Sequence, residues 1–393
     1  MSLRILHVLA TVDPASGGPV EGVQQLTRVN VEMGHHVEIV TLDDSASPFL
    51  DRLGVKVTAL GPRVGGVYRY TPLFVPWLKD HAGEFDCVVV NGIWQYNLYG
   101  AWRALRGMKV PFFVFTHGML DPWFKRRYPL KHLKKWLYWP WGVYPALQQA
   151  RAVFFTCEEE RRVARESFWL YECREFVLRY GIGGVPDEKD YREAFLSAHP
   201  QLRGKRLLLF LGRVAPKKGP DLLIRALAKI VDEGIVERTD LRLVMAGPVG
   251  GAYAVKLQEL ARRLRIDDLV YWPGLVLGDV KWGAFQASEA FVLPSHQENF
   301  GIAAAEALSA GTPVLLGTGV NTWPEIVADG AGFADEPSVA GCAAVLRRWF
   351  ALSAAQRSAM GEAARSCFRA RYTAIDAAHT FIAALYLLIN AAG

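Results

Sequence analysis

Two glutamates separated by seven residues, Glu298 and Glu306, flank a run of small residues in the stretch 296–314. If a helix begins near Phe300, Glu298 lies in the loop before it and Glu306 lies about two turns into it, on the order of 9 Å along the axis. Gly301 and the alanines after it let a ligand approach the backbone closely, and the unpaired N–H groups of a helix start favour an anionic or hydroxyl-rich ligand. The pattern therefore predicts a site for a sugar attached to a phosphate.

Two other interpretations of this pair are a buried amphipathic helix with two solvated carboxylates, and a glycosidase. A glycosidase that forms a covalent intermediate holds its two carboxyl groups about 5 Å apart. The helical offset between Glu298 and Glu306 is larger, so we do not expect this chemistry.

Gly311-Thr312-Pro313 then ends the helix before a short strand at 314–316.

A basic loop at 212–219 follows a predicted strand and carries Arg213 and Lys218. A guanidinium fork and an ammonium group together offset the negative charge of a diphosphate. The alternative is that Lys218 is a solvated loop lysine. No Asp-x-Asp motif is evident in the sequence, so we expect no metal ion at this site.

A histidine, His117, directly follows a predicted strand at 112–116 and opens the run HGMLDPW at 117–123. Ligand-binding loops lie at the carboxyl ends of parallel strands, so this position favours a binding role. The alternative is a structural histidine whose ring nitrogens are satisfied by neighbouring groups.

The elements that must position these residues form one pattern that occurs twice. The predicted order is a strand at 4–9, a helix at 20–33 and a strand at 36–42, and then again a strand at 206–211, a helix at 221–232 and a strand at 241–246. Gly18-Pro19 and Gly219-Pro220 hold matching positions, each with proline as the expected first helical residue. The G-x-G-x-x-G fingerprint of dinucleotide enzymes is lacking. We therefore predict an α/β fold with two nucleotide-type parallel sheets in tandem.

Further short apolar runs and periodic segments extend both halves. We expect strands at 87–90, 112–116, 270–272 and 290–293, helices at 254–264 and 280–286, and a last, mainly apolar helix at 373–393. A linker is expected between Gly181 and Lys205, where glycine and charged residues are frequent.

The composition indicates a globular protein of two ordinary domains. The chain has 393 residues, of which 51% are hydrophobic and 12% aromatic, with a net charge of +6. No apolar run is long enough to span a membrane, and the apolar start at 3–10 reads as a strand and not as a signal peptide. Five scattered cysteines without metal-site spacing fit a reducing cytoplasm best.

The segment from Pro122 to Cys157 contains no Asp or Glu, and in its first part lysine and arginine alternate with tryptophan and tyrosine. Aromatic residues of this kind settle at the water–lipid boundary, and basic residues are attracted to anionic lipids. We therefore predict that residues 123–144 form a membrane or acceptor face, including Trp123, Lys131, Lys134, Lys135 and Trp136. The alternative is that the aromatic rings fill a core and the basic residues are simply solvated. Prolines within the segment argue against one long helix.

The stretch 294–327 resembles retaining glycosyltransferases of family four, which have the GT-B fold. The family signature of a Glu, seven residues and a second Glu is filled by Glu298 and Glu306, with Pro294-Ser295 before it and WPEIV at 323–327 after it. The HGMLDPW run is similar to a bacterial branch that assembles polysaccharide or lipopolysaccharide. The resemblance extends over nearly the whole chain.

The resemblance implies a GT-B architecture, in which two Rossmann-like domains face each other across a cleft. Residues 1–185, completed by the helix 373–393, would bind the acceptor, and residues 186–372 would bind the nucleotide-sugar donor.

Individual roles follow from the matching positions. The catalytic residues implied are His117, which reaches the donor sugar, Arg213 and Lys218, which hold the diphosphate, and Glu298, which contacts sugar hydroxyls. The donor-binding positions implied are Gly17, Gly18, Gly247, Val276, Asn299, Phe300, Gly301 and Glu306, the last as the ribose partner. Asn299 stands where the family usually has a glycine after the first glutamate, which would alter how closely the sugar approaches.

The function implied is transfer of a sugar, with retention of configuration and without a metal ion or cofactor, from a UDP- or GDP-linked sugar to a glycan or lipid-linked acceptor. In the family, the departing phosphate is usually held to act as the base for front-face attack. The expected partners are this donor, the acceptor and an anionic membrane, without nucleic acid. The expected location is the cytoplasm, with peripheral attachment to the inner face of the plasma membrane.

Other GT-B functions remain as alternatives. A nucleotide-sugar epimerase would release free sugar without an acceptor. A phosphorylase would need lysine-bound pyridoxal phosphate and normally a much longer chain. A non-catalytic subunit would have lost the site, whereas His117, Arg213, Lys218 and the two glutamates are all present.

Overall fold

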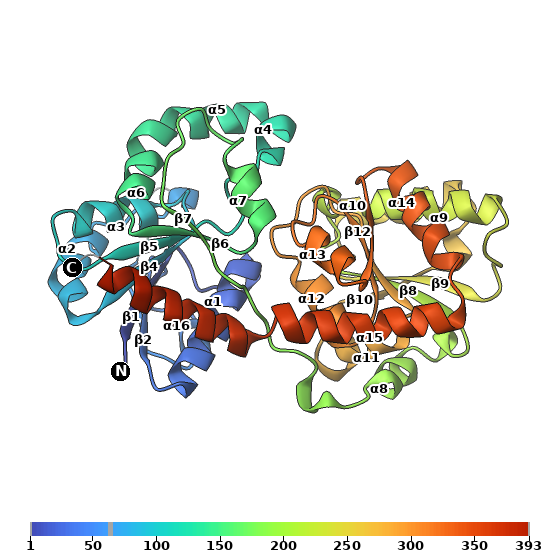
Figure 1. The fold of residues 1–393 in the computed structure, drawn as a ribbon. Coiled ribbons are helices and arrows are strands. Elements are labelled where there is room, and N and C mark those ends of the chain that lie inside the picture. The colour runs from blue at the N-terminus through green and yellow to red at the C-terminus, as the bar shows by residue number, and fades with distance from the viewer. Residues whose placement is uncertain (1, 62–65, 392–393) are drawn as a thin grey trace. The chain divides into compact units, whose positions relative to one another are not determined.

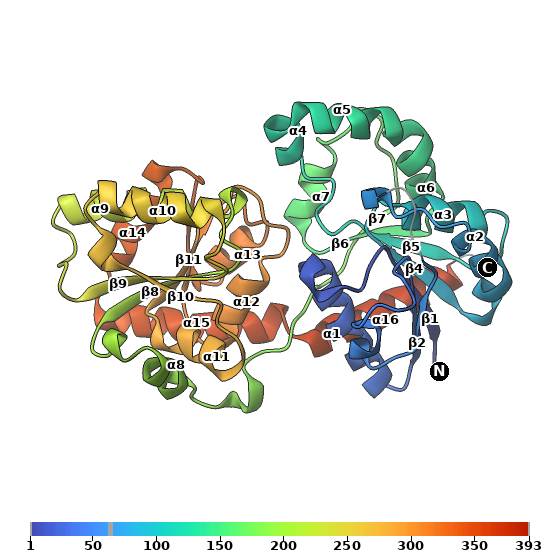
Figure 2. The ribbon, with the colours of Figure 1, turned by 180° about the vertical axis from the view of Figure 1, so that it is seen from behind.

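The computed structural model describes residues 2–61 and 66–391. The chain divides into two compact units: unit 1 is Met1–Gly181 with Ala374–Gly393, and unit 2 is Ile182–Thr373. The chain therefore leaves unit 1 once and returns to it at the last helix (Figures 1 and 2).

Unit 1 is built on a seven-stranded parallel sheet in the order β3-β2-β1-β4-β5-β6-β7. The strands are β1 (Arg4–Leu9), β2 (His36–Thr41), β3 (Val57–Ala59), β4 (Cys87–Asn91), β5 (Phe112–Phe115), β6 (Ala152–Phe155) and β7 (Glu175–Val177). The helices are α1 (Gly18–Glu32), α2 (Phe74–His81), α3 (Tyr96–Leu105), α4 (Trp123–Arg127), α5 (Pro129–Tyr138), α6 (Tyr144–Gln149), α7 (Glu158–Ala164) and α16 (Ala374–Asn390).

Two apolar layers cover the two faces of this sheet, because successive residues of a strand point to opposite sides. Val88 and Val90 of β4 pack with α2, α3 and α6 on one face. Cys87 and Val89 of the same strand pack on the other face, where Phe381 and its neighbours in α16 complete the layer. The central strands are thus buried on both sides, which explains their continuous apolar sequences.

Unit 2 is built on a six-stranded parallel sheet in the order β10-β9-β8-β11-β12-β13. The strands are β8 (Arg206–Leu211), β9 (Leu241–Ala246), β10 (Val270–Gly274), β11 (Ala290–Leu293), β12 (Val314–Gly317) and β13 (Gly332–Asp335). The helices are α8 (Arg192–Ala198), α9 (Pro220–Asp232), α10 (Ala252–Arg263), α11 (Gly278–Ala287), α12 (Ile302–Ser309), α13 (Trp323–Ala328), α14 (Val339–Phe350) and α15 (Ala354–Arg371). The helices pack in pairs, α8 on α11, α9 on α14 and α12 on α15.

The prediction of two Rossmann-like parallel sheets is confirmed, with differences of detail. The two glycine–proline pairs do not hold matching positions: the residue before the first helix is Gly17, so Gly18 is already helical, whereas Gly219 itself precedes the second helix. The segment expected to be a linker contains α8 and lies in unit 2. The expected boundary at 185 differs from the observed one because Ile182 already bridges Thr373 of unit 2.

Candidate functional site

In unit 2, the predicted donor residues gather where the strand order reverses. Strands β8 and β11 are neighbours, although β9 and β10 lie between them in sequence, and crevices form at the carboxyl ends of such strands. The loop after β8 and the loop after β11 are joined there, since the amide of His296 donates to the carbonyl of Lys217 (2.9 Å). A Cβ at Gly219 would lie 2.3 Å from the carbonyl oxygen of Pro294, so only glycine permits this approach.

Lys218 and Glu298 meet across these two loops. The Lys218 ammonium forms an ion pair with Oε2 of Glu298, and both side chains are mostly buried. The amide of Glu298 donates to the carbonyl of Gly319 (2.7 Å), which holds the glutamate beside the loop after β12. Arg213 lies in the same β8 loop and is exposed, with no ion pair to another residue in the described parts of the chain. Its guanidinium is therefore accessible to a ligand.

Helix α12 begins at Ile302, two residues later than the sequence suggested, because Gly301 adopts a left-handed conformation (φ 76°, ψ 58°). An L-residue is strained in this conformation. Gly301 aligns the first turn of the helix with the loop that carries Glu298. Glu306 lies one turn into α12, and its Oε1 is 2.9 Å from Nζ of Lys281 in α11.

The other predicted donor positions of unit 2 lie around the same edge of its sheet. Gly247 follows β9, and a Cβ there would lie 2.0 Å from the carbonyl oxygen of Gly212. Val276 has a buried side chain. Phe300 is also buried and packs edge-on against Tyr372 (5.4 Å between ring centroids), so only its backbone is suited to contact a ligand. Asn299 precedes it and is partly exposed.

Unit 1 has a cavity of about 490 Å³ at its own reversal of strand order, between β1 and β4. It is lined at one side by Leu9 and Ala10 at the end of β1, and by Asn91 at the end of β4. Ser16 and Pro19, on either side of Gly17 and Gly18, form another part of the lining. The predicted glycine loop thus borders this cavity.

In unit 1, the ring of His117 contacts the side chain of Asn91. Nε2 of His117 is 3.0 Å from Oδ1 of Asn91, and Nδ2 of Asn91 is 3.3 Å from Nδ1 of His7. If Asn91 accepts from His117 and donates to His7, the proton of His117 lies on Nε2 and its Nδ1 is an acceptor. Burial lowers the pKa of His117 to about 4, and burial followed by repulsion from His117 lowers that of His7 to about 3. Both rings are therefore neutral at physiological pH.

A buried glutamate that the sequence analysis did not single out, Glu160, fixes the loop of His117. Its Oε1 accepts from the hydroxyl of Thr116 (2.7 Å) and the amide of Gly118 (2.6 Å). Its Oε2 accepts from the amide and hydroxyl of Thr156, both at 2.7 Å. His117, which lies between Thr116 and Gly118 in the chain, has a φ of 49°, an uncommon value for a residue with a side chain. Four hydrogen bonds to one carboxylate hold the loop in this conformation.

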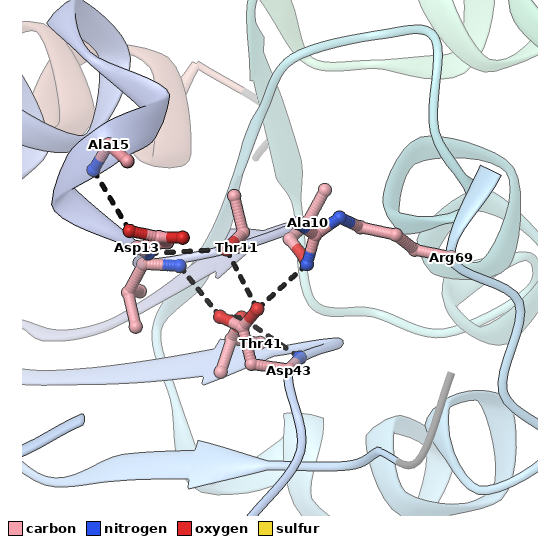
Figure 3. Close-up of polar contacts among 8 residues, drawn as sticks. Ala10, Thr11, Asp13, Ala15, Thr41, Asp43 and Arg69 are labelled. Carbon is pink, nitrogen blue, oxygen red and sulfur yellow. Dashed lines mark hydrogen bonds and ion pairs between the residues drawn. The ribbon is translucent and has the colours of Figure 1, made fainter. Parts of the chain in front are cut away.

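A second buried carboxylate, Asp43, fixes the loop after β1 (Figure 3). It accepts from the hydroxyl of Thr11 (2.7 Å), the hydroxyl of Thr41 (2.8 Å) and the amide of Val12 (2.8 Å). Nη1 of Arg69 is 2.7 Å from Asp43 and 3.2 Å from the carbonyl oxygen of Ala10. This cluster stiffens the loop that leads to Gly17.

Sequence reasoning missed Asp43, Asn91 and Glu160, although the first two follow β2 and end β4. Polar residues at the carboxyl ends of predicted strands were the available signal. Lys281 carries no such signal, because it lies within a helix and meets Glu306 only through the packing of α11 beside α12.

The segment 123–144 folds into α4, α5 and a short π-helical turn, η5 (Trp139–Val143), and ends at the first residue of α6; α4 and α5 lie at the top of unit 1 in Figures 1 and 2. No residue of α5 is buried. Its exposed apolar side chains, together with Trp141 and Trp169, form what we call the apolar ridge: Leu130, Leu133, Trp136, Leu137, Trp141 and Trp169. Lys131 and Lys134 are exposed on the same helix.

Two predicted members of this face are turned inward. Nζ of Lys135 lies 4.2 Å from the ring centroid of Trp94, and burial lowers its pKa to about 8. Trp123 is partly buried and packs edge-on against Phe124 and Tyr128. The aromatic rings are thus divided between the interior and the ridge, and leucines supply much of the exposed apolar surface.

Among the described residues, no helix has both the length and the apolar character needed to cross a bilayer.

Comparisons with known proteins agree with this architecture. The sucrose-phosphate synthase of Thermosynechococcus elongatus superposes with a TM-score of 0.77 at 20% identity, over 99% of this chain and all of the other. The Anabaena protein HepE, solved in complex with UDP and glucose, gives a TM-score of 0.76 at 16% identity, over 98% of this chain and all of the other. At these identities the likeness is one of fold.

A sequence relative is the D-inositol 3-phosphate glycosyltransferase of Streptomyces avermitilis, which is 39% identical over 184 residues. The match covers 45% of this chain and 39% of that relative, so the chain spans only about two fifths of its length.

Two family models match successive parts of the chain. The one described as "Glycosyl transferase 4-like domain" matches residues 17–180, and the one described as "Glycosyl transferases group 1" matches residues 192–366. These matches fall in unit 1 and unit 2 respectively. The chain therefore belongs to the glycosyltransferases that combine a glycosyl transferase 4-like domain with a group 1 domain.

Proposed function

We propose that the protein transfers a sugar from a nucleoside-diphosphate sugar to a hydroxyl of a glycan or lipid-linked acceptor, with retention of configuration and without a metal ion. The observation that carries the proposal is the pairing of Lys218 with Glu298 beside the start of α12, at the reversal of strand order in unit 2. Membership of the glycosyltransferase family supports it.

The proposed roles follow from the chemistry of each group. The exposed Arg213 and the ammonium of Lys218 stabilise the charge that develops on the departing diphosphate. Glu298 accepts from sugar hydroxyls, and Glu306 accepts from the ribose. His117 offers an acceptor nitrogen at Nδ1, and its neutral ring accepts a hydrogen bond from the donor sugar.

The proposed reaction breaks the bond between the anomeric carbon and the diphosphate oxygen. A bond forms between the same carbon and the acceptor oxygen on the same face. The proton of the acceptor hydroxyl passes to an oxygen of the departing phosphate, so no carboxylate of the protein becomes covalently attached. The lysine–glutamate pair must open or shift to admit the donor, since each group then gains a ligand partner.

We propose UDP as the first nucleotide to test and GDP as the second, because HepE was solved with UDP and glucose. Binding is measured by calorimetry with and without a chelator. We expect equal affinity in both conditions, since the diphosphate charge is offset by Arg213 and Lys218. Loss of binding in chelator would overturn metal independence.

The transfer itself is tested by following UDP or GDP release with and without acceptor extracts. We expect release to rise with acceptor, and to fall strongly in Lys218→Met, whereas the exposed Lys256→Met on α10 serves as the control. Release that is equal with and without acceptor, yielding free sugar, would favour an epimerase or hydrolase. No binding and no release would favour a non-catalytic subunit.

We further propose that the acceptor belongs to cell-surface polysaccharide assembly and that unit 1 docks on an anionic membrane through the apolar ridge. Leu130 is 79% exposed, Leu137 60% and Trp141 77%, which is unusual for such large apolar side chains in one region. The exposed Lys131 and Lys134 beside them complement anionic lipid, each contributing about 1 kcal/mol near the surface.

Vesicle co-sedimentation tests the docking. We expect binding to vesicles that contain phosphatidylglycerol, and weakening by salt. The double variant Lys131→Glu/Lys134→Glu should lower binding, and so should Leu133→Ser/Leu137→Ser. Lys229→Glu/Lys256→Glu, at two exposed positions of unit 2, is the matched control for the charge reversal. Equal pelleting with neutral vesicles, or none at low salt, would contradict the proposal and leave the ridge as a surface for another protein.

A further inference from the structure

A second polar cavity, of about 370 Å³, lies within unit 2 at the other end of its sheet. Its lining includes Ser288 and Glu289 just before β11, and Thr312 and Pro313 just before β12. These are the amino ends of the strands, whereas the loops of Lys218 and Glu298 follow the carboxyl ends. The cavity, which we call the basic pocket, is therefore separate from the proposed donor site.

Positive charge exceeds negative charge in the basic pocket. Three arginines line it, from α8 and α15: Arg192, Arg357 and Arg365. Of its two glutamates, Glu289 is already paired with Arg206, whose Nε and Nη2 lie 2.7 and 2.9 Å from the carboxylate oxygens. Glu289 is therefore largely neutralised by Arg206, and Arg192 in turn faces Asp190 outside the lining (3.8 Å). Glu362 is the remaining acidic lining residue beside Arg357 and Arg365.

Two buried donors of the pocket also lack an acceptor. Nε of Arg357 and Nε1 of the fully buried Trp349 have no hydrogen-bond partner in the described parts of the chain. The two groups are close, since the guanidinium carbon of Arg357 lies 5.5 Å from the Trp349 ring centroid. Both groups can only donate, so an anionic acceptor would satisfy them, and unsatisfied buried donors are costly.

The ion pairing of Arg357 within the protein is weak. Its Nη1 is 3.5 Å from Oε2 of Glu289, and its Nη2 donates to the carbonyl of Phe350 (3.2 Å). Burial, followed by repulsion from Arg206, lowers the pKa of Arg357. Within the described parts of the chain, Nη2 of Arg365 makes a long contact of 3.5 Å, to the carbonyl of Ala310. The two arginines of α15 thus retain donors for a ligand.

We propose that the basic pocket binds a phosphate group, with Arg357 and Arg365 as the main ligands. Arginine forks match the geometry of phosphate oxygens, and the cavity has room for a phosphate carried on a small polar molecule. This site goes beyond the proposed transfer, because it lies away from the donor loops. The ligand source is either free inorganic phosphate or a phosphorylated sugar.

The test is titration of the full chain with inorganic phosphate, with glucose 6-phosphate and with glucose. Nuclear magnetic resonance spectra record the indole N–H signal of Trp349 at each step of the titration. Trp349→Phe assigns this signal. We expect either phosphate probe to shift it and glucose to leave it unchanged. Tighter binding of glucose 6-phosphate would identify a phosphorylated sugar as the source, and equal binding would identify phosphate alone.

Variants separate this pocket from the donor site. Arg365→Met should weaken binding of the phosphate probe about tenfold, which is the effect of about 1.4 kcal/mol, and Arg357→Met should do the same if the variant stays folded. Arg263→Met, exposed on α10, is the matched control. Lys218→Met should leave the Trp349 shift unchanged, even if the proposed transfer fails. Binding lost in Lys218→Met, kept in Arg365→Met, or absent for both probes would overturn the proposal.

Discussion

Glu306 shows how one carboxylate can be tested for its role in nucleotide binding. If it accepts from the ribose, Glu306→Ala leaves the ribose hydroxyls unpaired and weakens binding of UDP or GDP by ~1–3 kcal/mol. Calorimetry measures this, with Glu259→Ala on the exposed side of α10 as the control. An unchanged affinity would remove the ribose role. Because Glu306 is held by Lys281 (2.9 Å) in the structure, Lys281→Met tests whether the ion pair positions the carboxylate.

The neutral state of His117 predicts a specific pH dependence. Its folded pKa of about 4 lies below the ordinary 6.5 because the ring is buried. The unfolded chain therefore binds more protons between these values, so the contribution to stability is complete above pH 6.5 and is lost as pH falls towards 4, by up to about 1.4 kcal/mol per pH unit. His7, with a pKa of about 3, acts in the same direction.

Nuclear magnetic resonance of the histidine rings checks this directly. The signals that disappear in His117→Gln should not titrate between pH 8 and pH 5 in the parent protein. His379→Gln, on the exposed side of α16, is the control for assignment. A His117 signal that titrates with a midpoint near pH 6.5 would show that the ring is not held neutral.

The start of α12 depends on the left-handed conformation of Gly301. Gly330 has a similar conformation (φ 71°), and a Cβ there would meet no atom within 4 Å. A Cβ at Gly301 would lie 3.1 Å from Val320. Alanine at either position should cost roughly 1–2 kcal/mol of stability through backbone strain.

Only Gly301→Ala should also weaken nucleotide-sugar binding, because it moves the first turn of α12 relative to Glu298. Thermal shifts with and without UDP separate the two effects, since ligand binding raises apparent stability by mass action. Similar UDP-induced shifts in both variants would mean that the start of this helix does not contact the ligand.

The sequence predicted the buried strands better than the edge strands. The bounds of β8, β9 and β11 agree with the prediction, because fully buried parallel strands are continuous apolar runs. Edge strands β3 and β7 are only partly buried, and their mixed sequences carry no comparable signal. The apolar strand β6 was not predicted either, although its residues are fully buried.

For the candidate site, the sequence identified loop residues but not the contacts between them. Lys218 and Glu298 are 80 residues apart, and they meet because β8 and β11 are neighbours in the sheet. The strand order of the sheet brings them together, and this order cannot be predicted from the residues around either position alone. The same applies to Lys281 and to Glu160, whose roles depend on packing between elements.

The last helix of the chain, α16, completes the core of unit 1. Phe381, Leu385 and their neighbours cover a face formed by β1, β4, β5 and β6. Phe381→Ala should therefore lower stability by about 3–5 kcal/mol, since Phe381 is almost fully buried. The exposed Leu387→Ser on the same helix should have little effect.

Calorimetry and limited proteolysis read out this difference. We expect Phe381→Ala to lower the stability of unit 1 alone. Fragments from residues 1–181 should then appear first, while unit 2 resists digestion. Early cleavage throughout unit 2 in this variant would mean that the two units do not unfold separately.

Because unit 2 interrupts unit 1 in the sequence, it is translated completely before unit 1 is complete. Protein domains generally fold in the order in which they leave the ribosome. Here every residue of unit 2 is translated before α16, so unit 2 can acquire its native fold while one face of the first sheet is still uncovered. The nascent chain thus carries an exposed apolar surface through the whole synthesis of its second unit, and a chaperone that shields this surface would act until the final helix is made.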